Sequence, residues 1–198
     1  MPSKAEITSA YIIKTVAPVF NKKGYSGTSM QDITLATGLT KGAIYGNFKN
    51  KNELAIKSFI YNINLITTKI EDAIVMKKTA LGKLYAITDF YKAYYRYTLK
   101  FGGCPILNIG IDANHQNPDL LEKVKKAIRN IQNNITKIIE FGIKSNEIKP
   151  TVDASFYSRI IFSRIEGAVF MSMTSNNEIY MEDMIISLEQ MIKNELEL

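Results

Sequence analysis

The chain has 198 residues, a length that fits one medium domain or a small module fused to a larger one. Apolar residues make up 46% of it and charged residues 22%, so it can bury a core without disulfides or metals. One cysteine and one histidine exclude an intrachain disulfide and leave almost no material for a metal site or a catalytic triad, so we expect no cofactor, no metal and no enzyme.

The net charge of +6 is concentrated near the N-terminus. Residues 1–60 contain eight lysines and three acidic residues, a net charge of +5, which leaves +1 for residues 61–198. A basic module attracts polyanions such as nucleic acid or an anionic membrane face, although a well-solvated surface accounts for the charge as well. No N-terminal apolar run is long enough for a signal peptide or a membrane span, so we expect a cytoplasmic protein without a membrane partner.

The first predicted helix is indicated by its apolar periodicity. Apolar residues from Ile7 to Phe20 recur every three or four positions, as on one face of a helix. Pro18 removes a backbone hydrogen bond, which predicts a kink or a late start of the helix. Gly24 is expected to end it.

Two short helices are predicted next. Thr28 and Gln31 have the spacing of a capping box, which predicts a helix over residues 29–37 that stops at Gly38. Thr40 is a suitable N-cap for a third helix over residues 40–48. Two short helices joined by a tight glycine turn form a helix-turn-helix.

The rest of the chain reads as long helices without convincing strand patterns. Asn50 and Glu53 mark the start of a fourth helix that reaches about residue 75. The fold class is therefore all-α, with an N-terminal helix-turn-helix domain over residues 1–50 and a larger helical domain over residues 51–198. Further helices are expected over residues 79–99, 104–113, 118–145, 153–174 and 179–197.

The third helix has the composition of a DNA-reading element. Ile44 and Phe48 lie one turn apart and are expected to anchor it to the module's core. In a helix-turn-helix the second helix enters the major groove, and small residues let it approach closely. The residues expected to face the groove are Lys41, Gly42, Ala43 and Tyr45.

Residues 24–54, "GYSGTSMQDITLATGLTKGAIYGNFKNKNEL", closely resemble the DNA-binding module of the TetR/AcrR family of bacterial repressors. The resemblance implies an all-helical homodimer that binds DNA with its N-terminal domain and a ligand with its C-terminal domain. It also implies phosphate contacts and groove contacts, which we assign to Thr28, Ser29, Thr40, Lys41, Gly42, Ala43, Tyr45, Asn47 and Lys51.

Three residues depart from the family pattern. Thr34 stands where the family prefers alanine, so its hydroxyl needs a hydrogen-bond partner. Gly46 replaces an aromatic or polar contact residue, and Asn47 replaces histidine or tyrosine. Asn47 can still donate to a phosphate. An alternative reading is therefore an all-helical protein that binds a small molecule or a partner and has lost DNA binding.

Residues 101–113, "FGGCPILNIGIDA", resemble a segment found in one branch of the same family. Pro105 suits the first turn of a helix, which places Cys104 near an N-cap, where the pKa of a thiol falls. Cys104 is either a redox or electrophile sensor or a small residue in a tight corner. The first reading would need an intermolecular disulfide if a disulfide is involved, because no second cysteine exists.

Five tyrosines lie in the predicted helix 79–99. Tyr91, Tyr94 and Tyr95 share a face, which fits either core packing or the aromatic wall of a ligand pocket. His115 is expected in a loop, either solvated or facing the pocket. The candidate ligand-binding residues are thus Tyr91, Tyr94, Tyr95, Cys104, Asn108, His115 and Phe170.

The last two predicted helices are candidates for a dimer interface. Residues 159–173 mix large apolar groups with small ones, and residues 181–196 repeat apolar groups at nearly heptad spacing. An intramolecular core explains both patterns too, but the family resemblance favours an interface. The residues assigned to it are Phe162, Ile165, Gly167, Phe170, Met184, Leu188, Met191 and Ile192.

Together these features predict a ligand-responsive transcriptional regulator, most simply a repressor. A homodimer would place two recognition helices in successive major grooves, about 34 Å apart, on a palindromic operator in double-stranded DNA. An unknown small-molecule effector would release the repressor by binding its two states with different affinities.

Overall fold

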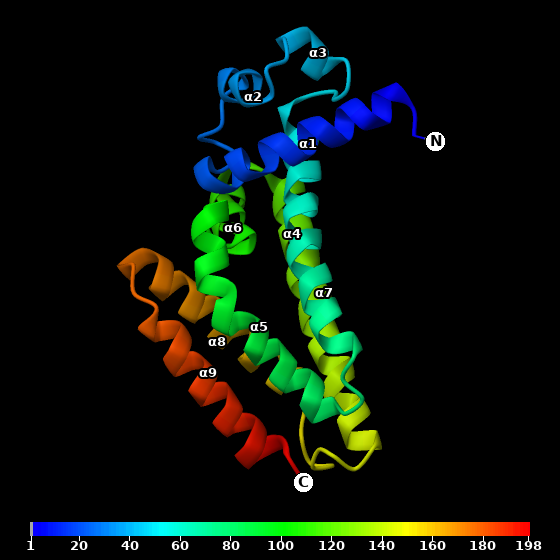
Figure 1. The fold of residues 1–198 in the computed structure, drawn as a ribbon, viewed down its shortest axis with the longest axis vertical. Helices are drawn as coiled ribbons and strands as arrows, with labels where there is room; N and C mark the ends of the chain where they lie inside the picture. Colours follow the sequence, from blue (N-terminus) through cyan, green and yellow to red (C-terminus); the bar gives the residue numbers. More distant parts are fainter. Residues whose placement is uncertain (1) are drawn as a thin grey trace. The chain divides into compact units, whose positions relative to one another are not determined.

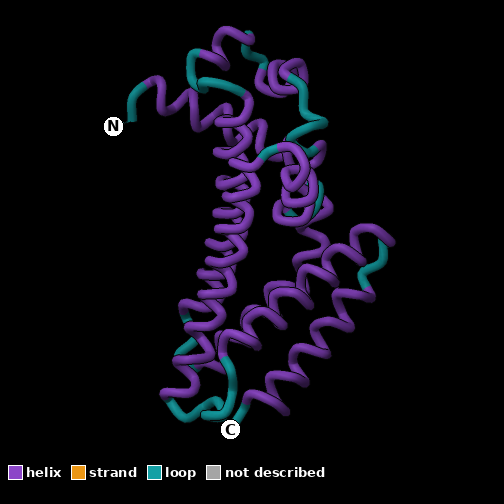
Figure 2. The backbone as a smooth tube through the Cα atoms, turned by 180° about the vertical axis from the view of Figure 1, so that it is seen from behind, coloured by secondary structure: helices purple, strands orange, loops and turns teal. Residues whose placement is uncertain are grey.

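The computed structural model describes residues 2–198, apart from the side chains of Lys100 and His115. Within that range the protein consists of helices and loops, and the sole extended pairing is an antiparallel bridge between Ile148 and Glu197 (Figure 2). The all-α prediction is confirmed. The helices are α1 (Lys4–Lys23), α2 (Met30–Thr37), α3 (Lys41–Tyr45), α4 (Lys51–Val75), α5 (Ala80–Phe101), α6 (Pro105–Gln116), α7 (Pro118–Lys144), α8 (Ala154–Ser175), α9 (Ile179–Met191) and the π-helical turn η1 (Ile192–Leu196) (Figure 1).

The chain forms two compact units, each built from segments that are distant in sequence. The first unit comprises the described residues up to Leu65 together with Phe101–Ala127. The second comprises Ile66–Lys100 and Ile128–Leu198. The division therefore differs from the expected boundary at residue 50, because part of α4, α6 and part of α7 fold with α1, α2 and α3.

The first helix begins earlier than the sequence suggested. Ser3 caps α1 in a reciprocal capping box: its hydroxyl accepts from the Glu6 amide at 3.2 Å, and the Glu6 carboxylate accepts from the Ser3 amide at 2.7 Å. Of the two alternatives predicted at Pro18, the late start is wrong, because α1 begins at Lys4 and continues through Pro18. Gly24 ends it as predicted, with φ of 73°, a conformation that favours glycine.

The capping box of α2 lies one residue later than predicted. Ser29, not Thr28, is the N-cap: its hydroxyl accepts from the Asp32 amide at 3.1 Å, and Asp32 accepts from the Ser29 amide at 2.8 Å. Asp32 thus takes the role that was assigned to Gln31. The helix ends at Gly38 in the left-handed conformation, as the turn requires.

The helix α3 is shorter than the predicted 40–48. It ends at Tyr45, and the chain continues through Gly46 and Asn47 into the buried Phe48. At the start of α4, Asn50 Oδ1 accepts a hydrogen bond from the Glu53 amide at 2.8 Å, as predicted. The Glu53 carboxylate accepts from the amide of Lys49, one residue before Asn50.

The second unit ends in a pair of adjacent helices, α8 and α9, which lie side by side (Figure 1). Asp153 caps α8 by accepting from the amides of Ser155 and Phe156. The predicted final helix, 179–197, is α9 followed by η1. The carbonyl of Leu196, the last residue of η1, accepts a hydrogen bond from the Lys149 amide at 2.9 Å. This hydrogen bond fastens the C-terminal turn to the loop before α8.

Candidate nucleic-acid interface and ligand cavity

The helix α3 divides into a buried face and an exposed face. Ile44 and Phe48 are each 1% exposed, so they anchor α3 in the first unit as predicted. Thr40 caps the helix, and its hydroxyl accepts from the Ala43 amide at 3.2 Å. The outward face carries Thr40, Lys41, Gly42 and Tyr45, with the Lys41 ammonium 5.9 Å from the Tyr45 ring.

Side chains of α1 hold the helix-turn-helix in place. The Tyr11 hydroxyl donates to the Thr37 carbonyl at the end of α2, at 2.9 Å. Ser9 donates to Oδ1 of Asn47 at 3.0 Å, and Nδ2 of Asn47 donates to the Ala43 carbonyl at 2.9 Å. Asn47, a predicted phosphate contact, is therefore engaged in fixing α3 to α1.

The start of α2 is a charged and hydrogen-bonded cluster. The Lys23 ammonium forms an ion pair with the Asp32 carboxylate at 2.6 Å. The hydrogen bond from Lys23, together with those from the Ser29 amide and hydroxyl, lowers the pKa of Asp32 far below its usual range. Ser29 is exposed, as a phosphate contact requires. Thr28 is only 1% exposed and its hydroxyl donates to the Gly24 carbonyl at 2.6 Å, so we leave it out of the interface.

The departure from the family pattern at Thr34 has a local explanation. The Thr34 hydroxyl has the partner that it needs, because it donates to the Gln31 carbonyl at 3.0 Å. Gly42 and Gly46 both lie on the exposed side of α3. A Cβ at Gly42 would meet only the Thr40 hydroxyl, at 3.9 Å, so the protein's own packing does not require glycine there.

Lys51, the predicted phosphate clamp, begins α4. Its ammonium lies 4.4 Å from the centre of the Tyr25 ring. Partial burial lowers the pKa of Lys51, while the carboxylates of Asp112 and Asp32 act in the opposite direction. The Lys51 ammonium thus sits beside the loop that leads into α2.

The segment around Cys104 belongs to the first unit and packs on the end of α1. Asn108 donates to the carbonyls of Asn21 and Gly102 at 2.9 and 2.6 Å, and Asn21 donates to the Gly103 carbonyl at 2.9 Å. Cys104 is buried at the N-cap of α6. This arrangement agrees with the reading of Cys104 as a small residue in a tight corner.

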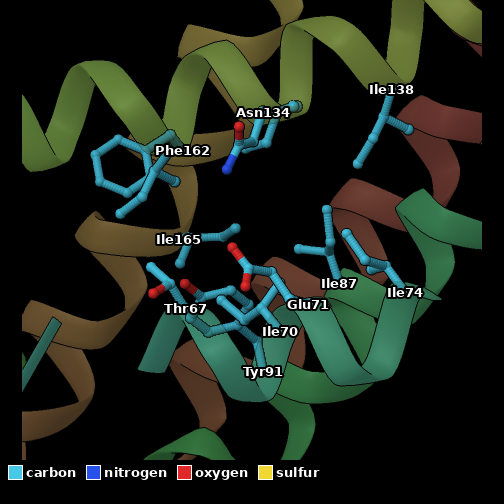
Figure 3. Close-up of a pocket in the computed structure, with 12 residues that line it drawn as sticks. Thr67, Ile70, Glu71, Ile74, Ile87, Tyr91, Asn134, Ile138, Phe162 and Ile165 are labelled. Atoms are coloured by element: carbon cyan, nitrogen blue, oxygen red, sulfur yellow. The ribbon is translucent and has the colours of Figure 1, made fainter. Parts of the chain in front are cut away.

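A cavity lies in the second unit among α4, α5, α7 and α8 (Figure 3). Its walls are mainly isoleucines, and its polar groups include Glu71 and Asn134. Of the seven candidate ligand-binding residues, Tyr91 is the one that lines this cavity. The lining residues are Thr67, Ile70, Glu71, Ile74, Ile87, Tyr91, Ile131, Asn134, Ile135, Ile138, Phe162 and Ile165.

The other six candidates lie elsewhere. Tyr94 is buried in an aromatic cluster and stacks on Tyr97, with ring centres 6.2 Å apart. The Tyr95 hydroxyl donates to Asn176 at 3.1 Å. Phe170 is exposed on α8, and Cys104 and Asn108 belong to the first unit. His115 lies in α6 and not in a loop, and its side chain is outside the described part of the structure.

Sequence reasoning missed Glu71, Asn134 and Thr67 as cavity residues. Each is a polar residue on an amphipathic helix, where an outward-facing polar side chain is ordinary. No motif surrounds them, so only the packing of four helices identifies them.

The predicted dimer residues divide into two groups. Gly167 and Phe170 are exposed, and a Cβ at Gly167 would meet no atom within 4 Å. The other six are each at most 6% exposed and belong to the core of the second unit, so within one protomer the intramolecular reading applies to them: Phe162, Ile165, Met184, Leu188, Met191 and Ile192.

The described residues contain neither a metal-binding cluster nor a helix suited to a membrane. No group of three or more metal-ligating side chains comes together among them. None of the helices in this range is both long enough and apolar enough to cross a membrane.

Two family models match the chain. Residues 12–57 match the model of bacterial regulatory proteins of the tetR family, and residues 80–188 match the Tetracyclin repressor-like C-terminal domain. The first match covers the helix-turn-helix. The second covers the cavity residues of α5, α7 and α8, whereas those of α4 lie outside it.

Individual proteins resemble the chain over most of its length. A TetR-family transcriptional regulator from Cytophaga hutchinsonii has a crystal structure with a TM-score of 0.93 and 34% identity, covering 100% of this chain and 98% of that one. The fatty acid metabolism regulator protein of Bacillus subtilis is 26% identical over 159 residues, 80% of this chain and 79% of the relative. The crystal structure of the regulator FadR from Bacillus subtilis in complex with stearoyl-CoA shares the fold, with a TM-score of 0.76 and 22% identity, covering 93% of this chain and 97% of that one.

Proposed function

We propose a ligand-controlled repressor, starting from the fact that the chain belongs to the tetR family of bacterial regulatory proteins. It is a helix-turn-helix transcriptional regulator, and its helical C-terminal part belongs to the same family. The outward face of α3 supports the proposal that this helix binds DNA. It presents cationic, aromatic and small residues, while the opposite face is anchored in the core.

The proposed interface consists of α3 and the starts of two other helices. Lys41 would donate to guanine O6 or N7, and Gly42 would let the helix backbone approach the base edges. Tyr45, 41% exposed, would reach a phosphate or a base. Ser29 and Lys51 would hold the phosphate backbone from the starts of α2 and α4.

A homodimer on a palindromic operator is the second part of the proposal. Within one protomer, α8 and α9 expose large apolar side chains to solvent. Gly167 leaves room for another helix to approach α8 closely. A twofold pairing through this face would hide it from water and supply two recognition helices. The exposed apolar residues are Phe156, Phe170, Met171, Ile179 and Ile186.

The effector is proposed to bind in the cavity of the second unit. Helix α4 begins at Lys51, a proposed phosphate contact, and the same helix lines the cavity from Thr67 to Ile74. A ligand that favours one position of α4 would therefore change the geometry available to the DNA-binding residues. Because its target is DNA, we place the protein in the cytoplasm.

The experiment is a DNA-binding titration with the purified full chain. Fragments that flank the protein's own gene are compared with scrambled fragments at several salt concentrations. We expect a salt-sensitive, sequence-specific complex, a footprint with twofold symmetry, and loss of specific affinity in Lys41→Ala and Tyr45→Ala with unchanged thermal stability. Absence of any specific complex, also after selection from random DNA, would overturn the proposal in favour of a ligand-binding protein that has lost DNA binding.

A further inference from the structure

The cavity of the second unit has walls of one chemical kind. Six isoleucines from α4, α5 and α7, with Phe162 and Ile165 from α8, form most of its surface. Ile135, Ile165 and Phe162 are each at most 5% exposed, so the deep part of the cavity is apolar and shielded from water. Such a surface favours an apolar ligand body over a sugar, a nucleotide or another polar molecule.

The polar groups of the cavity are found at its solvent-accessible side. Glu71 on α4 and Asn134 on α7 are exposed residues of the lining, and Figure 3 shows both side chains directed toward the space between the helices. Glu71 is the acidic residue of the lining, and no lysine or arginine accompanies it there. Within the described residues, no hydrogen bond or ion pair engages its carboxylate.

The shape of the cavity limits the apolar part of the ligand. Its volume is about 50 Å³, so in this arrangement of the helices a ligand has to displace side chains of the lining. A single unbranched chain needs the least displacement of the isoleucine walls, because close-packed side chains resist expansion.

We propose that this cavity takes a slender amphiphile with a cationic head, such as an alkylammonium ion, as the ligand class of the effector site. The chain would lie between the isoleucines, and the ammonium would lie at the mouth, where the Glu71 carboxylate and the Asn134 amide oxygen accept its hydrogen bonds. The proposal rests on the proposed function, because it specifies the ligand of the same effector site.

Charge distinguishes this ligand class from amphiphiles of the same length. A carboxylate head would meet the Glu71 carboxylate, and a like charge at the rim of a cavity disfavours binding. An alcohol would gain the same apolar burial without the charge interaction. The order of affinities therefore becomes octylammonium first, octanol second and octanoate last.

The test uses isothermal titration calorimetry of the full-length protein with octylammonium, octanol and octanoate at one ionic strength. We expect octylammonium to bind at least about tenfold more tightly than octanoate, because attraction of one and repulsion of the other both contribute. Added salt should reduce the ratio of the affinity for octylammonium to that for octanoate, and it should leave the affinity for octanol unchanged.

Three variants locate the binding. Glu71→Gln should reduce the preference for octylammonium over octanoate to about twofold or less, since it removes the charge and keeps the shape. Glu140→Gln, an exposed glutamate of α7 outside the lining, is the matched control and should leave the preference unchanged. Ile70→Trp should fill the cavity and abolish binding of all three probes, with the thermal unfolding curve as the check on folding.

The outcomes separate this inference from the proposed function. Equal or tighter binding of octanoate, an unchanged preference in Glu71→Gln, or no binding of any probe would each overturn the inference. DNA binding by the ligand-free protein is measured separately, so specific DNA binding without amine preference would leave the repressor proposal intact. Amine preference without specific DNA binding would overturn the repressor proposal and retain the ligand class.

Discussion

The hydroxyl of Ser9 in α1 donates a hydrogen bond of 3.0 Å to Oδ1 of Asn47, two residues beyond the end of the recognition helix. Nδ2 of Asn47 donates back to the Ala43 carbonyl inside that helix, at 2.9 Å. One amide therefore joins two helices through both of its polar groups. Asn47, one of the three residues at which this chain departs from the family pattern, therefore has an internal structural task.

Replacement of Ser9 by alanine tests that task without altering α3 itself. The variant leaves Oδ1 of Asn47 without its donor in a partly buried place, so we expect the free energy of unfolding to fall by about 1 kcal/mol. Specific DNA affinity should fall as well, because the orientation of α3 is less firmly held. Urea denaturation and DNA titration measure the two effects, and a Ser9→Ala variant that changes neither would contradict the assignment.

Gly42→Ala separates the needs of the fold from those of DNA recognition. A Cβ at this position meets only one atom, at 3.9 Å, and alanine has the higher helix propensity, so we expect stability to rise by up to about 1 kcal/mol. Specific DNA affinity should fall, because the added methyl group stands between the helix and the base edges. A more stable variant with unchanged affinity would show that α3 does not approach DNA at residue 42.

Lys51→Ala addresses the proposed phosphate contact. Loss of one phosphate contact should lower the slope of log affinity against log salt by about 1, with little effect on sequence preference. Lys78→Ala, which removes an exposed lysine of the second unit, should leave the slope unchanged. Because Lys51 also lies over the Tyr25 ring, thermal unfolding of the variant is recorded alongside. An unchanged slope in a folded Lys51→Ala protein would remove Lys51 from the interface.

Charge introduced on the exposed face of α8 and α9 should separate the proposed dimer. Phe170→Asp and Ile186→Asp alter side chains that are 45% and 55% exposed, so each variant should fold and elute as a monomer in size exclusion with light scattering. Val75→Asp changes an exposed apolar residue at the end of α4 and should keep the native mass. A dimer that survives both Asp substitutions would place the interface on a different surface.

Acid should weaken the cluster at the start of α2. The folded state lowers the pKa of Asp32, chiefly through the hydrogen bond from Lys23 and then through those from Ser29, so this carboxylate stabilises the fold above its unfolded pKa of about 4. That contribution is lost as pH falls below 4 toward the folded-state pKa. Asp32→Asn should therefore melt at a lower temperature than the native protein at pH 7, and the difference should shrink in acid. A difference that is independent of pH would contradict this role.

Local sequence signals predicted the elements of the first unit well. Gly24 and Gly38 end helices because they adopt positive φ, and Ile44 and Phe48 are buried because they lie one turn apart on α3. Capping was predicted less accurately at α2, since Thr28 and Ser29 are both suitable N-caps and only the position of Asp32 decides between them.

The candidate ligand site was the part that sequence reasoning predicted least well. Tyr91, Tyr94 and Tyr95 share one helix face, yet only Tyr91 lines the cavity, because the neighbouring helices cover the other two. Met184 and Leu188 have the spacing of an interface helix and are buried within the protomer. A period of apolar residues identifies a packed face, but it does not say whether the packing partner is the same chain or a second copy.

The sequence by itself determined the helix-turn-helix, the exposed face of its second helix and the family, because those properties depend on residues close together in the chain. The tertiary structure decided that 101–127 folds with the DNA-binding helices, that Asn47 binds Ser9, and that Glu71 and Asn134 share a cavity. Those relationships join residues from separate helices, and the free energy that sets them comes from packing across the fold and not from any local pattern.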